Sequence, residues 1–114
     1  MIYEQGDWKR FRDLPGVREV DFHWSDDGPR EVDYWEAMEE VHRVALEALK
    51  NAQADPEINY VLFTHGWSTS GPFKITARSV IRGLMRSKAS TPYIVKAKSI
   101  QHESVFVAAV KRAR

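Results

Sequence analysis

One continuous apolar run, Asn59-Tyr60-Val61-Leu62-Phe63-Thr64, constrains the fold of this chain more than any other stretch. A run of β-branched and aromatic residues of this length is typical of a strand that is buried on both faces of a sheet. Before it, from about Glu31 to Ala52, apolar residues recur at steps of three and four, which predicts a long amphipathic helix. A buried strand preceded by such a helix indicates an α/β unit.

The other predicted elements extend this unit in both directions. Residues 17–24 alternate between apolar and polar and predict a strand, and Pro72 is placed to begin a second helix that runs to about Lys88. Residues 93–98 and 104–110 predict two closing strands joined by a hairpin. The order β-α-β-α-β-β predicts a two-layer α/β (α+β) sandwich on a mixed four-stranded sheet with right-handed crossovers.

The first 16 residues are expected to form a lead to this domain. Trp8, Phe11 and Leu14 recur there at helical spacing before Pro15 and Gly16 end the pattern. We therefore expect a short helix or turn in residues 1–16, packed as a lid on a single domain that spans residues 17–114.

Composition narrows the class of protein. The chain of 114 residues, 43% hydrophobic and 29% charged, has the size and balance of one globular domain. It has no cysteine, which excludes disulfides, thiolate metal sites and a thiol nucleophile and suits a reducing compartment. No stretch approaches the roughly 18 apolar residues of a membrane span. We therefore expect a cytoplasmic protein that has no contact with membranes.

Charge is divided unevenly along the chain. Residues 1–57 hold 15 acidic and 7 basic side chains, whereas residues 58–114 hold 10 basic side chains and one acid, Glu103. The formal net charge of +1 hides this division. A basic surface attracts polyanions through phosphate contacts and counterion release, although a basic face can also be merely solvated. Nucleic acid is therefore a candidate partner.

Four basic residues of the second predicted helix share one face. Lys74, Arg78, Arg82 and Arg86 are spaced four apart, so they drift by only about 40° per step around the helix axis. No acid occurs in residues 59–102 that could pair with them. Like charges at this spacing repel unless an anion lies across them. The pattern predicts a phosphate-binding face, and a solvated helix is the alternative.

The segment before that helix has the composition of a phosphate-binding loop. It contains Gly66, Trp67, Ser68, Thr69 and Ser70. The free N–H groups of the first helical turn, the hydroxyls and the Lys74 ammonium would converge there, as at phosphate sites on helix N-termini. A capped turn that uses its glycines for unusual dihedral angles would have the same composition.

Three residues near the ends of the first two predicted strands are candidates for catalysis. Asp21 and His23 end the first strand, and His65 follows the second. Parallel strands joined by a helix bring their carboxyl ends to one edge of a sheet, so these side chains could meet in a cleft. A carboxylate with imidazoles can act as a general base or hold a divalent ion for phosphodiester hydrolysis. A structural hydrogen bond is the alternative role for each histidine.

Two further surfaces are candidates for contact with a partner. Trp24 and Trp67 lie in the two predicted loops at that edge, where exposed indoles could stack on unpaired bases, and burial in the core is the alternative. The first predicted helix carries acids that could dock a protein or only form a solvated face. These acids are Glu36, Glu39, Glu40 and Glu47.

In its motifs the chain resembles the small MutS-related (Smr) domain family. That family has a Leu-Asp-Leu-His-Gly strand end, a long helix, and an apolar strand that ends in His-Gly-x-Gly. The matching segments are Val20-Asp21-Phe22-His23-Trp24 and Phe63-Thr64-His65-Gly66-Trp67-Ser68, with Trp24 and Ser68 at family glycines. The similarity covers about residues 17–112.

The Smr resemblance implies a sheet like that of the C-terminal domain of bacterial translation initiation factor three, nucleic-acid binding and, in several members, metal-assisted endonuclease activity. Two functions therefore stay open. The chain is expected to be an endonuclease that uses magnesium or manganese on RNA or branched DNA, or a non-catalytic module that binds RNA, DNA or a protein through the same basic edge.

Overall fold

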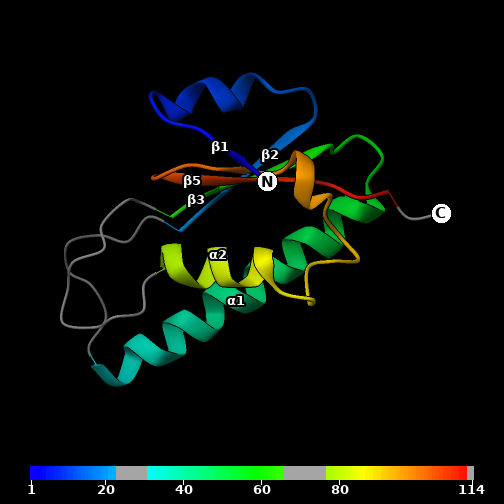
Figure 1. The fold of residues 1–114 in the computed structure, drawn as a ribbon. Coiled ribbons are helices and arrows are strands. Elements are labelled where there is room, and N and C mark those ends of the chain that lie inside the picture. Colours follow the sequence, from blue (N-terminus) through cyan, green and yellow to red (C-terminus); the bar gives the residue numbers. More distant parts are fainter. Residues whose placement is uncertain (23–30, 66–76, 113–114) are drawn as a thin grey trace.

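The computed structural model describes residues 1–22, 31–65 and 77–112. In chain order the elements are β1 (Ile2–Tyr3), the 3₁₀ helix η1 (Trp8–Asp13), β2 (Val17–Asp21), α1 (Glu31–Ala54), β3 (Tyr60–Thr64), α2 (Ala77–Arg86), the 3₁₀ helix η2 (Lys96–Lys98), β4 (Ile100–Gln101) and β5 (Val105–Ala109). The strands form one sheet in the order β1-β4-β5-β3-β2. Figure 1 shows α1 and α2 on one face of this sheet and η1 on the other.

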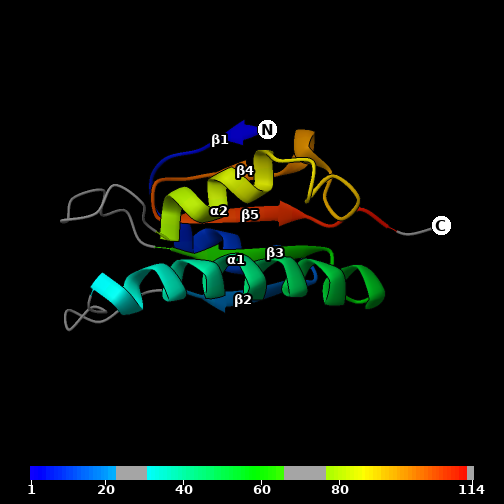
Figure 2. The same cartoon turned by 90° about the horizontal axis from the view of Figure 1, so that it is seen from below.

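The sheet is mixed, as predicted. β2 and β3 are parallel, with Val17 opposite Tyr60 and Asp21 opposite Thr64. β5 runs antiparallel to both β3 and β4, and β1 is parallel to β4. Figure 2 shows α1 crossing the β3 and β2 side of the sheet and α2 lying over β5 and β4. The α/β class and the long crossover helix of the prediction are therefore confirmed.

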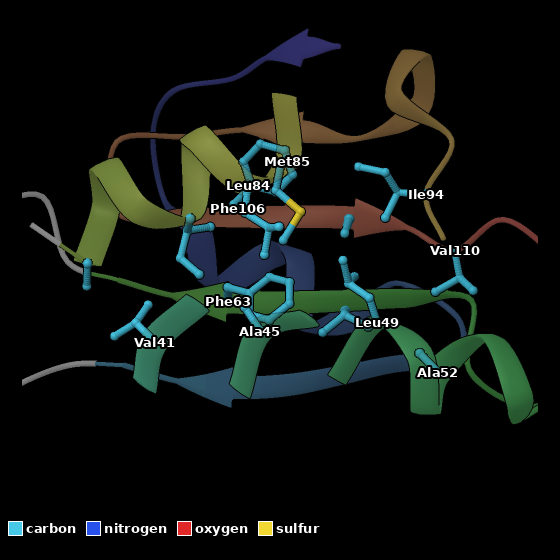
Figure 3. Packing of buried hydrophobic residues seen from close by; sticks show 14 of the residues in the cluster. Val41, Ala45, Leu49, Ala52, Phe63, Leu84, Met85, Ile94, Phe106 and Val110 are labelled. Atoms are coloured by element: carbon cyan, nitrogen blue, oxygen red, sulfur yellow. The ribbon is translucent and has the colours of Figure 1, made fainter. Parts of the chain in front are cut away.

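The larger hydrophobic core lies between the sheet and the two long helices (Figure 3). Its members from α1 include Val41, Ala45, Leu49 and Ala52, which follow one another at steps of three or four and so form one buried stripe. Phe63 of β3 fills the layer above them and stacks on Phe22, with ring centroids 6.1 Å apart. Among the described residues no helix is long and apolar enough to cross a bilayer.

A second, smaller core explains why β3 and β5 are apolar at almost every position. Phe11 of η1 packs with Leu62, Val105 and Val107 on the face of the sheet opposite the long helices. Trp8 and other half-buried side chains surround this group. Each of the two central strands is therefore buried on both faces. The 3₁₀ helix η1 therefore covers this face of the sheet.

Of the two predicted closing strands, the one at residues 104–110 is confirmed as β5, whereas the one at residues 93–98 is not formed as predicted. Residues 93–98 contain only an isolated bridge between Ile94 and Val110, followed by η2, and the paired strand β4 lies in the segment that was expected to be the hairpin loop. The Ser99 hydroxyl donates to the Val95 carbonyl at 2.9 Å and accepts from the Ala109 amide at 3.0 Å. These side-chain bonds take backbone groups that a regular ladder would use.

The predicted strand count of four is also wrong. β1 adds a fifth strand beside β4, through amide-to-carbonyl bonds from Ile2 to Ser99 at 2.8 Å and from Glu4 to Gln101 at 3.1 Å. The first 16 residues therefore contribute one strand of the sheet, β1, and the helix η1, which packs on one face of it.

Candidate nucleic-acid interface

The three described arginines of the predicted basic face lie on the flank of α2 that meets β4. We name Arg78, Arg82 and Arg86 the arginine row. Arg82 Nη2 donates to the carbonyl of His102 at 3.2 Å, and Arg86 Nη2 donates to Gln101 Oε1 at 2.6 Å. The opposite flank of α2 supplies Ala77, Ile81, Leu84 and Met85 to the core. Lys74 lies outside the described residues.

Charges within the arginine row disfavour one another. Partial burial lowers the pKa of Arg82, and the charges of Arg78 and Arg86 lower it further, while Glu103 and Tyr3 act in the opposite direction. Arg82 and Arg86 are held by neutral oxygens, and neither forms an ion pair with a carboxylate in the part of the chain that the structure describes. An anion placed across the row would relieve this repulsion.

Other basic residues of the second half of the chain have structural contacts. Lys96 Nζ donates to the carbonyls of Arg86 at 3.2 Å and Ser87 at 2.8 Å, so it stabilises the carboxyl end of α2 and adds a cation next to the arginine row. Arg112 instead binds backbone carbonyls near the end of α1, including that of Asp55 at 2.9 Å. The basic half of the sequence therefore serves packing as well as surface charge.

The predicted catalytic residues Asp21 and His65 come to the same edge of the sheet. Asp21 lies opposite Thr64 in the parallel pair, and His65 is the next residue after β3. Asp21 Oδ1 accepts from the Thr64 hydroxyl at 2.7 Å, and the His65 amide donates to the Ser104 carbonyl at 3.1 Å. His23, the third predicted member, lies outside the described residues.

Strand alternation sends Asp21 and His65 to opposite faces of that edge. Successive side chains of a strand point to opposite faces, so His65 follows Phe63 toward the long helices, whereas Asp21 lies on the face of η1. The hydrogen bond to Glu19 is the main cause of the raised pKa of Arg12 on η1, and the charge of Asp21 adds to it, which agrees with this placement. The two side chains therefore share an edge but not a face.

The donors described at this edge do not by themselves fit a magnesium or manganese site. Asp21 is the one described carboxylate that the prediction placed there, and such ions take most of their ligands from oxygen atoms. No group of three or more His, Cys, Asp or Glu side chains that could hold a metal ion occurs in the described ranges.

The predicted phosphate-binding loop falls outside the described residues. This applies to Gly66, Trp67, Ser68, Thr69 and Ser70, and also to Trp24. Its role in binding phosphate therefore stays a prediction, as does base stacking by the two tryptophans.

The four acids of α1 that the prediction named are exposed, as expected, but part of their charge is compensated. Arg43 binds both Glu40 and Glu47 along the same helix, and its hydrogen bond lowers the pKa of Glu40. Glu36 and Glu39 are exposed on the same helix. Docking of a protein on these acids stays a prediction.

His102 has a structural role that its position in a hairpin loop did not indicate. Its ring is only 5% exposed and meets Phe11 edge-on, with centroids 6.0 Å apart. Nδ1 accepts from the Ser104 amide at 3.0 Å, so the ring proton is on Nε2, which donates to the Gly6 carbonyl at 2.7 Å. His102 thus joins the lead to the hairpin, while its own carbonyl binds Arg82.

Comparisons of the chain with protein-family models, with curated proteins and with solved structures found no match.

Proposed function

We propose that this chain is a nucleic-acid-binding domain that holds phosphates along the arginine row. The observation that carries the proposal is the line of three arginines along α2, in which Arg82 and Arg86 bind neutral oxygens. Burial, and then the charges of Arg78 and Arg86, lower the pKa of Arg82. On α1, in contrast to Arg82 and Arg86, Arg43 pairs with two glutamates. Like charges at this spacing repel one another, and planar guanidinium groups can bind phosphate through two parallel hydrogen bonds.

The length of the row suits a phosphate backbone. Eight residues separate Arg78 from Arg86, which corresponds to about 12 Å along a helix. In a duplex, where each strand has one phosphate per roughly 3.4 Å of helix axis, this distance covers about three to four nucleotide steps. The row can therefore contact several successive phosphates of one strand.

A binding measurement at fixed low salt tests the proposal. Fluorescence anisotropy with labelled single-stranded and duplex RNA and DNA compares the wild-type chain with Arg78→Gln/Arg86→Gln. Arg82 is left unchanged because its bond to the His102 carbonyl has a structural role. The control is Lys9→Gln/Lys50→Gln, which removes the same charge from exposed positions on η1 and α1. We expect weaker binding for the arginine variant alone, and equal weakening in both variants would contradict the role of the row.

Endonuclease activity is a second candidate function. The favouring observation is that β2 and β3 are parallel and end together, which brings Asp21 and His65 to one edge of the sheet, on its two faces. We extend the proposal to membership of the Smr family, supported by the order β2, α1, β3, α2 and by the two motifs. The labelled substrates are incubated with magnesium or manganese. Asp21→Asn and His65→Ala should abolish cleavage and spare binding, whereas full cleavage by the double variant would reject these residues.

A further inference from the structure

β1 places an exposed aromatic side chain beside the arginine row. Tyr3 is 68% exposed and Ile2 is 42% exposed, and no other large hydrophobic side chain whose burial the structure describes is exposed to this degree. Tyr60 and Tyr93, by contrast, are half-buried against the two cores. The backbone of β1 is bound to β4 on both sides of Tyr3, so the strand does not depend on the Tyr3 ring for its position.

The register of β1 determines which face of the sheet Tyr3 occupies. Tyr3 lies opposite Gln101, whose side chain accepts from Arg86, whereas Ile2 lies opposite Ile100, which packs in the core under η1. Alternation along the strand therefore directs Tyr3 to the face of α2 and Ile2 to the face of η1. In Figure 2, β1 lies beside β4 on the same side of the molecule as α2.

The Tyr3 side chain is also within electrostatic range of the row. Tyr3 raises the pKa of Arg82, against the effects of burial and of the neighbouring arginines. An exposed aromatic ring and a row of guanidinium groups thus share one surface. Aromatic rings beside a positively charged track are the combination that binds single-stranded nucleic acid, because the ring stacks on a base while the cations bind its phosphates.

We propose that Tyr3 is a stacking platform for an unpaired base of single-stranded nucleic acid whose phosphates lie along the arginine row. This inference rests on the proposed function and adds the kind of strand that the surface selects. In a duplex the faces of the bases are covered by their neighbours, so the Tyr3 ring can reach a base only where the strand is unpaired. Every base has a flat face, so we expect little dependence on sequence.

The experiment compares strands with and without bases. Labelled single-stranded RNA and DNA oligonucleotides are titrated in parallel with abasic strands of the same length and with duplexes. Tyr3→Ala should bind base-containing single strands about 5- to 150-fold more weakly than wild type, the range expected for one lost stack. Its affinity for abasic strands and duplexes should be unchanged. Tyr3→Phe should keep the affinity of wild type, since it keeps the ring.

Ile2→Ala is the matched control. It removes an exposed apolar side chain from the adjacent residue of β1, on the other face of the sheet, and should leave binding unchanged. Circular dichroism checks that the fold of each variant is intact. The RNA and DNA arms tell which nucleic acid is preferred, and a loss in either arm supports the proposal.

The results that would overturn stacking by Tyr3 differ from those that would overturn phosphate binding by the arginine row. If Tyr3→Ala binds single strands as tightly as wild type while Arg78→Gln/Arg86→Gln binds them more weakly, stacking by Tyr3 is overturned and phosphate binding by the arginine row is not. If the wild-type chain binds abasic strands or polyphosphate as tightly as base-containing strands, stacking by Tyr3 is also overturned. If the wild-type chain binds an acidic peptide but no nucleic acid, both stacking by Tyr3 and nucleic-acid binding by the arginine row are overturned.

Discussion

Replacing Gly16 by alanine should destabilise the chain strongly, because this glycine fixes the start of β3 against β2. Gly16 has φ of +68°, where an L side chain costs about 1 to 2 kcal/mol. A Cβ at Gly16 would lie 2.5 Å from the Glu57 carbonyl oxygen and 3.0 Å from the Asn59 amide nitrogen, both backbone atoms. Overpacking of this kind costs a further ~1 to 3 kcal/mol. We expect Gly16→Ala to lose about 2 to 5 kcal/mol of unfolding free energy.

The backbone around Gly16 also explains why the clash cannot be relieved by a small shift. The Gly16 carbonyl accepts from the amides of Asn59 at 2.7 Å and Tyr60 at 3.2 Å, so movement of the turn would weaken the first bonds between β2 and β3. Those bonds set the register that brings Asp21 opposite Thr64. A change at Gly16 should therefore act on the candidate edge as well as on stability.

Gly83→Ala is the matched control for this prediction. It is the same chemical change, but an added Cβ at Gly83 would have nothing within 4 Å. Glycine inside a helix costs about 0.5 to 1 kcal/mol relative to alanine, so this variant should be more stable by that amount. Urea denaturation followed by circular dichroism measures both changes, with an unchanged slope against urea as the test of two-state unfolding. A neutral Gly16→Ala, or a Gly83→Ala as unstable as Gly16→Ala, would refute the reasoning.

Two further predictions concern stability and the lead. Leu49→Ala should lower the free energy of unfolding by about 2 to 5 kcal/mol, because Leu49 is fully buried between α1 and the sheet. Leu46→Ala, at a half-buried position of the same helix, should lower it less, and urea denaturation midpoints compare the two variants. His102→Ala should lower the free energy of unfolding by about 1 to 3 kcal/mol, because it leaves the Gly6 carbonyl and the Ser104 amide without their ring partner. It should also speed hydrogen exchange of the backbone amides in residues 2–14. Exchange rates that match wild type would contradict the role of His102.

The centre of the fold could be predicted from the sequence because its patterns are local. The apolar run that contains Phe63 has no polar position, and the stripe through Ala45 and Leu49 has a helical period, so strand and helix follow from neighbouring residues alone. The parallel pairing of β2 with β3 then follows from a helix between them. These elements were placed correctly.

The edges of the sheet could not be predicted, because they depend on contacts between distant segments. β1 contains only two residues and has no period of its own, and its place is set by bonds to Ser99 and Gln101. Residues 93–98 have the composition of a strand, but η2 and the Ser99 hydroxyl bonds take up their backbone groups. Local propensity was overridden by tertiary pairing.

One part of the candidate interface could also be predicted from local sequence patterns, and another part could not. The spacing of Arg78, Arg82 and Arg86 predicts a row as soon as the segment is a helix, and the structure places α2 there. The position of Tyr3 beside that row depends on the pairing of β1 with β4, so no local pattern could indicate it. Likewise, the faces occupied by Asp21 and His65 depend on how the strands pair.

The salt dependence of nucleic-acid affinity tests the central claim most directly. Dissociation constants of the wild-type chain, Arg78→Gln/Arg86→Gln and the control Lys9→Gln/Lys50→Gln are measured for one single-stranded oligonucleotide over a series of salt concentrations. Each lost phosphate contact lowers the slope of log affinity against log salt by about 0.7 for single strands. If both arginines bind phosphate, the slope of the arginine variant should fall by about 1.4, while the control keeps the slope of wild type. Identical slopes for all three proteins would contradict phosphate binding by the arginine row.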